Sequence, residues 1–138
     1  PRTVQNAISL IEKEKVFCLF DSVGTPTTVR VLPLLKLFES QGAFLMGAFT
    51  GAQSLREAPY SRFVVNVRAS YRQETQAMVD AFVGMGRSRI GVLVEGDAYG
   101  TAGRSGVKRA LEGLYGASDI AFEYDPEFFK LFSLYLFI

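Results

Sequence analysis

The chain has 138 residues, of which 49% are hydrophobic and 21% charged, and its 15 basic and 14 acidic side chains leave a net charge of +1. This composition is typical of a globular domain, and the near-neutral charge excludes a strongly basic nucleic-acid-binding protein. With no His and one Cys, the sequence also excludes imidazole catalysis, His-ligated metal sites and an internal disulfide. We therefore predict no metal and no bound cofactor.

Helical spacing of apolar residues predicts two long helices in the first half of the chain. The first covers residues 3–15. The second starts at Thr25, which stands at the N-cap position before Pro26, and Pro33 is expected to kink it. Short apolar runs predict buried strands at residues 16–20, 43–46 and 63–67, and capping-box spacing predicts a short helix from Ser54.

The second half repeats this pattern. Ser70 and Gln73 have the spacing of a capping box, so a helix is expected to begin there and to end at Gly84 and Gly86. Another helix is predicted over residues 101–114 with Gly116 closing it, and strands are predicted at residues 89–94 and 120–124. Continuous apolar strands between amphipathic helices predict an α/β fold, a three-layer sandwich with mostly parallel sheets covered on both faces.

Such a sheet binds ligands at the carboxyl ends of its strands, which directs attention to the loops. The first loop, residues 21–25, offers the hydroxyls of Ser22 and Thr25, with Gly24 between them, at a helix N-terminus. Backbone N–H groups and the positive end of the helix dipole suit a carboxylate or phosphate there. An ordinary helix cap is the alternative. The loop lacks the Gly-Lys-Ser/Thr ending of a nucleotide-binding P-loop.

The second loop, residues 47–51, is built from small residues that let a ligand approach the main chain closely. Ala48 and Thr50 could supply main-chain and hydroxyl contacts, and Phe49 lies between them. After the fourth strand, Tyr99 could stack on a ligand or bind it through its hydroxyl. The alternatives are a plain turn for the second loop and a surface tyrosine for Tyr99.

The sequence gives little support for an enzyme. Its serines have no His partner, and Asp21, Glu95 and Asp97 are interpreted as solvated loop charges. Gly100, Gly103 and Gly106 form a G-x-x-G-x-x-G run that only approaches the dinucleotide-binding spacing G-x-G-x-x-G. A Rossmann-like nucleotide-binding enzyme is thus a minor alternative, and we predict that the chain is not an enzyme.

Four ordered stretches resemble the type I periplasmic solute-binding proteins of the branched-chain amino-acid (Leu/Ile/Val) ABC transporter family. They are Asp21-Ser-Val-Gly-Thr-Pro-Thr-Thr, Phe44-Leu-Met-Gly-Ala-Phe-Thr-Gly-Ala, Phe63-Val-Val-Asn-Val-Arg-Ala-Ser-Tyr and Arg89-Ile-Gly-Val-Leu-Val-Glu-Gly-Asp-Ala-Tyr-Gly. The resemblance runs from about residue 4 to about residue 124. It implies two α/β lobes that close by hinge motion over a solute, which an ABC membrane permease then receives, in the periplasm or outside the cell.

By this resemblance, residues 1–67 would belong to the first ligand-binding lobe and residues 68–124 to the second, with the first hinge crossing at 68–70. The first loop would meet the ligand carboxylate, the second loop its amino and carboxylate groups, and an aromatic residue of the second lobe would close over it. The implied ligand-binding residues are Ser22, Gly24, Thr25, Ala48, Phe49, Thr50 and Tyr99. The ligand is expected to be a carboxylate or an amino acid.

The chain also departs from this family. Family members are more than twice as long, and residues 125–138 form an atypical hydrophobic tail. We expect a truncated product with a shifted reading frame near Asp125, or else a tail that forms a core-filling or dimer-forming strand. Exposed sheet edges favour a homo-oligomer, and half a cleft should bind ligand weakly or not at all. A ligand-sensing regulatory domain with the same lobes is the second alternative.

Overall fold

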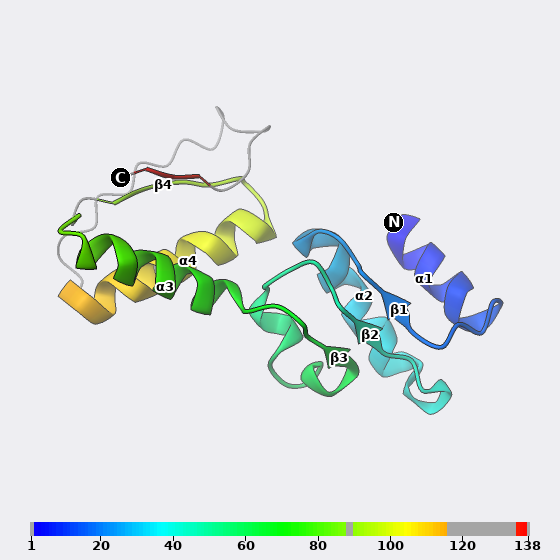
Figure 1. Cartoon of the computed structure of the whole chain (residues 1–138). Coiled ribbons are helices and arrows are strands. Elements are labelled where there is room, and N and C mark those ends of the chain that lie inside the picture. Colours follow the sequence, from blue (N-terminus) through cyan, green and yellow to red (C-terminus); the bar gives the residue numbers. More distant parts are fainter. Residues whose placement is uncertain (1, 88–89, 116–134, 138) are drawn as a thin grey trace. The chain divides into compact units, whose positions relative to one another are not determined.

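The computed structural model describes residues 2–87, 90–115 and 135–137 (Figure 1). The chain divides into two compact units, which we call unit 1 (residues 1–69) and unit 2 (residues 70–138). Each unit buries apolar residues of its own. Within the described residues, no helix combines the length and the apolar character that a membrane crossing requires.

Unit 1 is built on a parallel sheet of strands β1 (Leu19–Phe20), β2 (Leu45–Met46) and β3 (Val64–Val65), in the order β1-β2-β3. Helix α1 (Arg2–Glu12) packs against helix α2 (Thr25–Leu37). Short 3-10 helices at Glu39–Gln41, Gln53–Leu55 and Ser61–Phe63 complete the unit. The strands lie where the sequence predicts them but are shorter, because regular pairing covers only two residues of each apolar run.

The register of this sheet separates two rows of side chains. Leu19, Leu45 and Val64 align in one row, in which Leu45 is fully buried and Val64 is 8% exposed. The next residue of each strand points to the other face, and Phe20 and Val65 there are 70% and 47% exposed. One face of the described sheet thus joins the core of unit 1, and the other presents apolar side chains to solvent.

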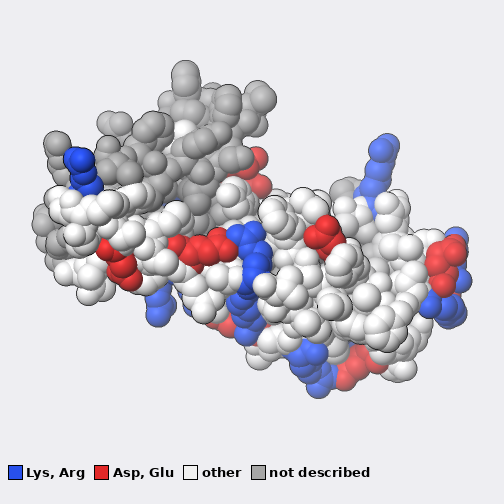
Figure 2. Space-filling model, viewed as in Figure 1, with Lys and Arg blue, Asp and Glu red and all other residues white. Residues whose placement is uncertain are grey.

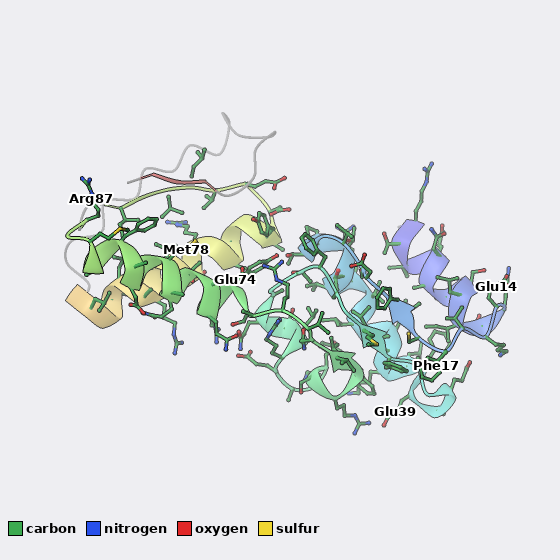
Figure 3. The ribbon with its side chains drawn as sticks, in the orientation of Figure 1. Glu14, Phe17, Glu39, Glu74, Met78 and Arg87 are labelled. Atoms are coloured by element: carbon green, nitrogen blue, oxygen red, sulfur yellow. The ribbon has the colours of Figure 1, made fainter. Side chains whose placement is uncertain are left out.

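Phe17, which precedes β1, is another exposed apolar side chain of unit 1. Phe17, labelled in Figure 3, is 85% exposed and touches Phe44 edge to face, with ring centroids 5.2 Å apart. Nearby, Glu39, also labelled there, forms an ion pair with Arg62 on the surface of unit 1. Such an exposed pair contributes little to stability, so burial of apolar groups has to hold this unit together.

Two of the predicted helix starts in unit 1 are wrong. The N-cap of α2 is Gly24, whereas Thr25 lies inside the helix and is buried. Ser54 does not form a capping box, because it lies within the 3-10 helix that follows Ala52 and makes no capping hydrogen bond. Both residue types suit a cap, but the Thr25 hydroxyl instead contacts Thr50 of a neighbouring loop.

Unit 2 pairs helix α3 (Tyr71–Gly84) with helix α4 (Ala98–Tyr115), and both run beside strand β4 (Gly91–Leu93) in Figure 1. The predicted capping box is confirmed: Gln73 N donates to Ser70 Oγ over 3.1 Å, and Ser70 N donates to Gln73 Oε1 over 2.9 Å. The core consists of Val79, Ile90, Val92, Val107, Ala110 and Leu111.

Strand β4 pairs antiparallel with strand β5 (Tyr135–Phe137), so residues of the hydrophobic tail take part in the unit 2 sheet. The predicted strand at residues 120–124 and the predicted helix stop at Gly116 lie outside the described residues. Among the described residues, β5 is the neighbour of β4, and the strand at residues 120–124 stays a prediction.

The glycine run lies inside α4 and serves close packing. A Cβ atom on Gly106 would stand 2.3 Å from Thr75 Oγ1 on α3, and one on Gly100 would stand 1.9 Å from the carbonyl oxygen of Glu95. Apart from the first turn, helical N–H groups are taken up by intrahelical bonds. The run therefore provides space between backbone segments, and most of it cannot cradle a phosphate.

We predict that Gly106→Ala lowers the free energy of unfolding by about 1–3 kcal/mol, because overpacking forces α3 and α4 apart. Gly113→Ala is the matched control in the same helix, since a Cβ atom there meets nothing within 4 Å. That control should be neutral or stabilising by up to about 1 kcal/mol. Urea denaturation followed by circular dichroism measures both, and equal effects would contradict the packing role.

Candidate functional site

The loops that follow β1 and β2 lie side by side at the carboxyl edge of the sheet. Val23 and Phe49 form a parallel bridge beyond the regular strands, and Phe49 N donates to the carbonyl oxygen of Ser22 over 2.9 Å. The pairing of β1 and β2 thus continues into the first loop (residues 21–25) and the second loop (residues 47–51). Six of the seven predicted ligand-binding residues are brought together there.

A buried hydroxyl pair joins these two loops. Thr25 Oγ1 and Thr50 Oγ1 are 2.7 Å apart, and the two residues are 3% and 0% exposed. Ala52 N donates to Thr50 Oγ1 over 3.2 Å. The two hydroxyls face each other inside the unit, so their first role is to fix the loops, and ligand contact through them remains a prediction.

The N-terminus of α2 offers backbone donors beside this pair. Gly24 has φ of +89°, a conformation that favours glycine, and a Cβ atom there would meet Thr27 Oγ1 at 3.1 Å. The N-cap residue, Gly24, has no side chain that could cap the helix, and the first turn contains no acidic residue. Ser22 Oγ lies 2.9 Å from Thr28 Oγ1 at the side of this helix end. The positive end of the dipole is therefore suited to an anion.

Phe49 and Arg68 add an apolar and a cationic surface to the same edge. The Phe49 side chain is 63% exposed, and the Arg68 guanidinium lies 5.3 Å from its ring centroid, within cation–π range. Ala48 is buried beneath the loop. The sequence analysis missed Arg68 as a site residue, although its position three residues after β3 places it at the same sheet edge.

Tyr99 belongs to unit 2, where it lies in the first turn of α4. Its ring packs edge to face on Tyr71, with centroids 5.3 Å apart and planes at 71°. Asp97 caps this helix, accepting from Tyr99 N over 2.8 Å and from Gly100 N over 3.0 Å. The interpretation of Asp97 as a solvated loop charge is therefore wrong. Tyr71 is a second residue that the sequence analysis missed, because only the fold brings it to Tyr99.

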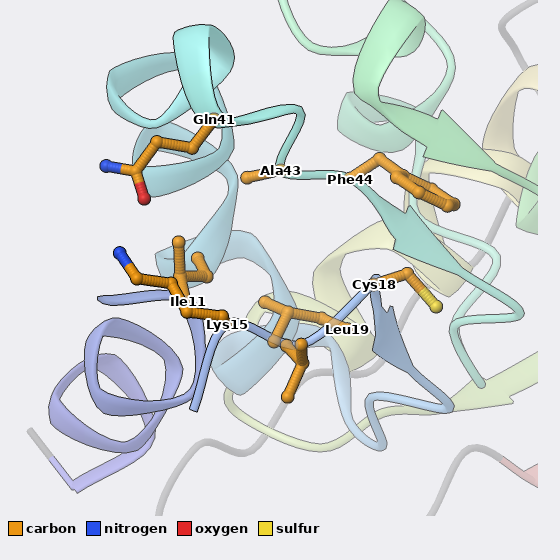
Figure 4. A pocket seen from close by; sticks show the side chains of 8 residues that line it. Ile11, Lys15, Cys18, Leu19, Gln41, Ala43 and Phe44 are labelled. Carbon is orange, nitrogen blue, oxygen red and sulfur yellow. The ribbon is translucent and has the colours of Figure 1, made fainter. Parts of the chain in front are cut away.

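A cavity of about 220 Å³ lies in unit 1 away from these loops (Figure 4). It opens at the amino ends of β1 and β2, whereas the loops follow the carboxyl ends. Its lining residues are Ile11, Lys15, Val16, Cys18, Leu19, Gln41, Ala43 and Phe44. This largely apolar cavity is separate from the hydroxyl pair and from the N-terminus of α2.

Positive and negative side chains are mixed on the face shown in Figure 2. Each unit carries both Lys or Arg and Asp or Glu side chains on that face. Among the residues that the structure describes, no three His, Cys, Asp or Glu side chains gather closely enough to hold a metal ion. The groups that the two loops of unit 1 and Arg68 present include hydroxyls, backbone donors, an aromatic ring and a single guanidinium.

Comparison with known proteins identifies the family. A family model described as periplasmic binding protein matches residues 1–126. The chain belongs to the periplasmic binding protein family. This membership confirms the resemblance that the four ordered stretches indicate, and it confirms the α/β fold class. No curated protein matches the sequence significantly.

Solved structures of this family share the fold of the chain. A possible leucine/isoleucine/valine-binding protein from Rhodopirellula baltica is 33% identical with a TM-score of 0.74, and a substrate-binding periplasmic protein from Ralstonia solanacearum is 32% identical with a TM-score of 0.72. An ABC transporter solute-binding protein from Rhodopseudomonas palustris, in complex with p-hydroxybenzoic acid, is 20% identical with a TM-score of 0.70. Each alignment covers 88% of this chain and 32% of the other, so the chain spans about a third of their length.

We predict that Thr50→Val lowers the free energy of unfolding by about 1–3 kcal/mol, because it removes a buried acceptor from Ala52 N and a partner from the hydroxyl pair. Thr101→Val is the control, since Thr101 is exposed on α4, and it should change stability by less than about 0.5 kcal/mol. Urea denaturation compares the two. A Thr50→Val effect as small as that of the control would show that the pair does not fix the loops.

Proposed function

We propose that this chain forms the ligand-holding part of a solute-binding receptor that takes up a small amphipathic carboxylate of amino-acid type and passes it to an ABC membrane permease. Membership of the periplasmic binding protein family supports the receptor role, and it supports a periplasmic or extracellular location. The names of two structural relatives, one a possible leucine/isoleucine/valine-binding protein and one in complex with p-hydroxybenzoic acid, refer to molecules that carry a carboxylate.

The observation that carries this proposal is the bridge between Val23 and Phe49. It places the N-terminus of α2, whose N-cap residue is a glycine, beside the exposed ring of Phe49. Backbone donors at a helix N-terminus favour a negative group, and an aromatic ring favours an apolar one. A molecule with a carboxylate at one end and an apolar side chain at the other satisfies both surfaces.

Each predicted site residue then has a role in this proposal. The Ser22 hydroxyl and the backbone at Gly24 receive the carboxylate, while the main chain at Ala48 meets the amino group. Phe49 packs against the apolar part of the ligand. The side chains of Thr25 and Thr50 hold the two loops in register. In the proposal, the main chain of both residues also contacts the ligand.

We further propose that residues 1–67 act as the first lobe and residues 68–124 as the second, with residues 68–70 as the hinge crossing. Closure would bring Tyr99 over a ligand that has docked on the loops of the first lobe. Such a change is driven only by the difference in ligand affinity between the open and closed states. A rigid Tyr99, held by its contact with Tyr71, would lose little conformational entropy on closure.

Titration of the 15N-labelled chain with L-leucine, followed by NMR, tests the proposal. We expect a dissociation constant on the order of 1 mM, since one lobe supplies only part of the contacts. Shift changes should gather at the amides of residues 22–25 and 48–50. L-leucinamide, which lacks the carboxylate, is the matched control and should bind more weakly. Equal binding of both compounds, or no shift at these amides, would contradict the proposal.

We predict that Ser22→Ala weakens the binding of L-leucine by about threefold to tenfold, because one hydrogen bond to a charged group is lost. Ser105→Ala removes a hydroxyl from an exposed position of α4 and should leave the affinity unchanged. The same NMR titration measures both variants. If Ser105→Ala weakened binding as much as Ser22→Ala, the first loop would not be the carboxylate site.

A further inference from the structure

Arg56 connects the second loop to the end of unit 1. Its Nη1 donates to the carbonyl oxygen of Ala52 over 3.2 Å, and its Nη2 donates to the carbonyl oxygen of Arg68 over 2.7 Å. Ala52 directly follows the second loop, and Arg68 lies one residue before Ala69, the last residue of unit 1. A single guanidinium therefore holds two backbone segments that are far apart in the sequence.

Together with two further contacts, these bonds link the second loop and the backbone of Arg68 into one continuous set of contacts. The backbone of Arg68 accepts from Arg56, while the guanidinium of Arg68 lies over the ring of Phe49. On the other side, Ala52 N donates to Thr50 Oγ1. Any movement of the second loop thus acts on the segment before Ser70 by two routes, the backbone of Ala52 and the ring of Phe49.

We propose that Arg56 is the positioning residue that couples occupancy of the second loop to residues 66–70, the segment that follows β3 and contains the proposed hinge crossing at 68–70. This proposal rests on the proposed function, since it concerns how the same site reports a bound ligand. Arg56 is assigned no contact with the ligand. It fixes the backbone of Arg68, and Arg68 in turn sets where the Phe49 ring can lie.

The chemistry of the side chain explains why an arginine suits this position. The planar guanidinium presents several N–H donors in a fixed fork, so it can serve two carbonyl oxygens at once. A lysine ammonium would serve the same oxygens as a flexible point charge. Asn66 Nδ2 also donates to the carbonyl oxygen of Leu55 over 3.2 Å, which ties the same two segments a second time next to Arg56.

The test compares Arg56→Met, which keeps much of the apolar stem, with Arg56→Lys and with the control Arg30→Met. Arg30 is exposed on α2, and its replacement changes the net charge equally. L-leucine affinity, measured by NMR titration of the full chain, should fall about tenfold for Arg56→Met, in line with the loss of two part-buried hydrogen bonds from a charged group. It should fall less for Arg56→Lys and stay within twofold for Arg30→Met.

A double-variant comparison separates positioning from general loosening of the fold. In a Phe49→Ala background, Arg56→Met should weaken binding by less than twofold, because the ring that it positions is absent. If Arg56→Met weakened L-leucine binding by the same factor with and without the Phe49 ring, the two effects would be independent and the proposal would be overturned. Equal affinity of Arg56→Met and Arg30→Met would overturn it as well.

Amide hydrogen exchange on the ligand-free chain tests the coupling role of Arg56 separately from the proposed receptor function. Arg56→Met should speed exchange in residues 50–52 and 66–70 together, by about tenfold, whereas Arg30→Met should not. If the wild-type chain bound neither L-leucine nor 4-hydroxybenzoate, the proposed function would fail, and joint exchange of the two segments would still decide whether Arg56 couples them. Unchanged exchange in either segment would overturn the coupling.

Discussion

The parallel pairing of β1 with β2 is the constraint on which the site of unit 1 depends. Parallel strands end at the same edge of a sheet. The pairing alone therefore brings together the residues that follow each strand. The bridge between Val23 and Phe49 carries this pairing into the loops. Once it exists, the buried contact between Thr25 and Thr50 becomes geometrically available, although 25 residues separate them.

The sequence predicted the features that follow from local periodicity. Apolar residues at helical spacing placed α1, α2 and α3, and the Ser70–Gln73 capping box is present with both of its bonds. These predictions succeeded because each depends on residues within one or two turns of one another. The short apolar runs likewise marked the strands, since a strand that joins a core must be apolar wherever it lies.

The sequence could not predict what tertiary contacts decide. Thr25 is a residue type that is favoured at an N-cap, yet its hydroxyl is hydrogen-bonded to that of Thr50. The N-cap is instead Gly24, which has a positive φ, and the helix begins one residue earlier than predicted. The glycines of α4 only approach the dinucleotide-binding spacing, and the structure explains Gly106 by the approach of Thr75 on α3. Arg68 belongs to one of the four quoted stretches and Arg56 to none of them, yet neither was predicted for the site, because their contacts exist only where two distant backbone segments meet.

The site combines a rigid interior with an exposed contact surface, and this division has a physical reason. Ordering a loop when a ligand binds reduces the affinity by the conformational entropy that is lost. The Thr25–Thr50 pair and the Arg56 fork remove that freedom in advance with bonds at the edge of the core. Phe49 is left exposed on a loop that is already fixed. In the proposed function, a ligand meets a surface that is already formed, and the contacts that hold this surface also run to the segment where unit 1 ends.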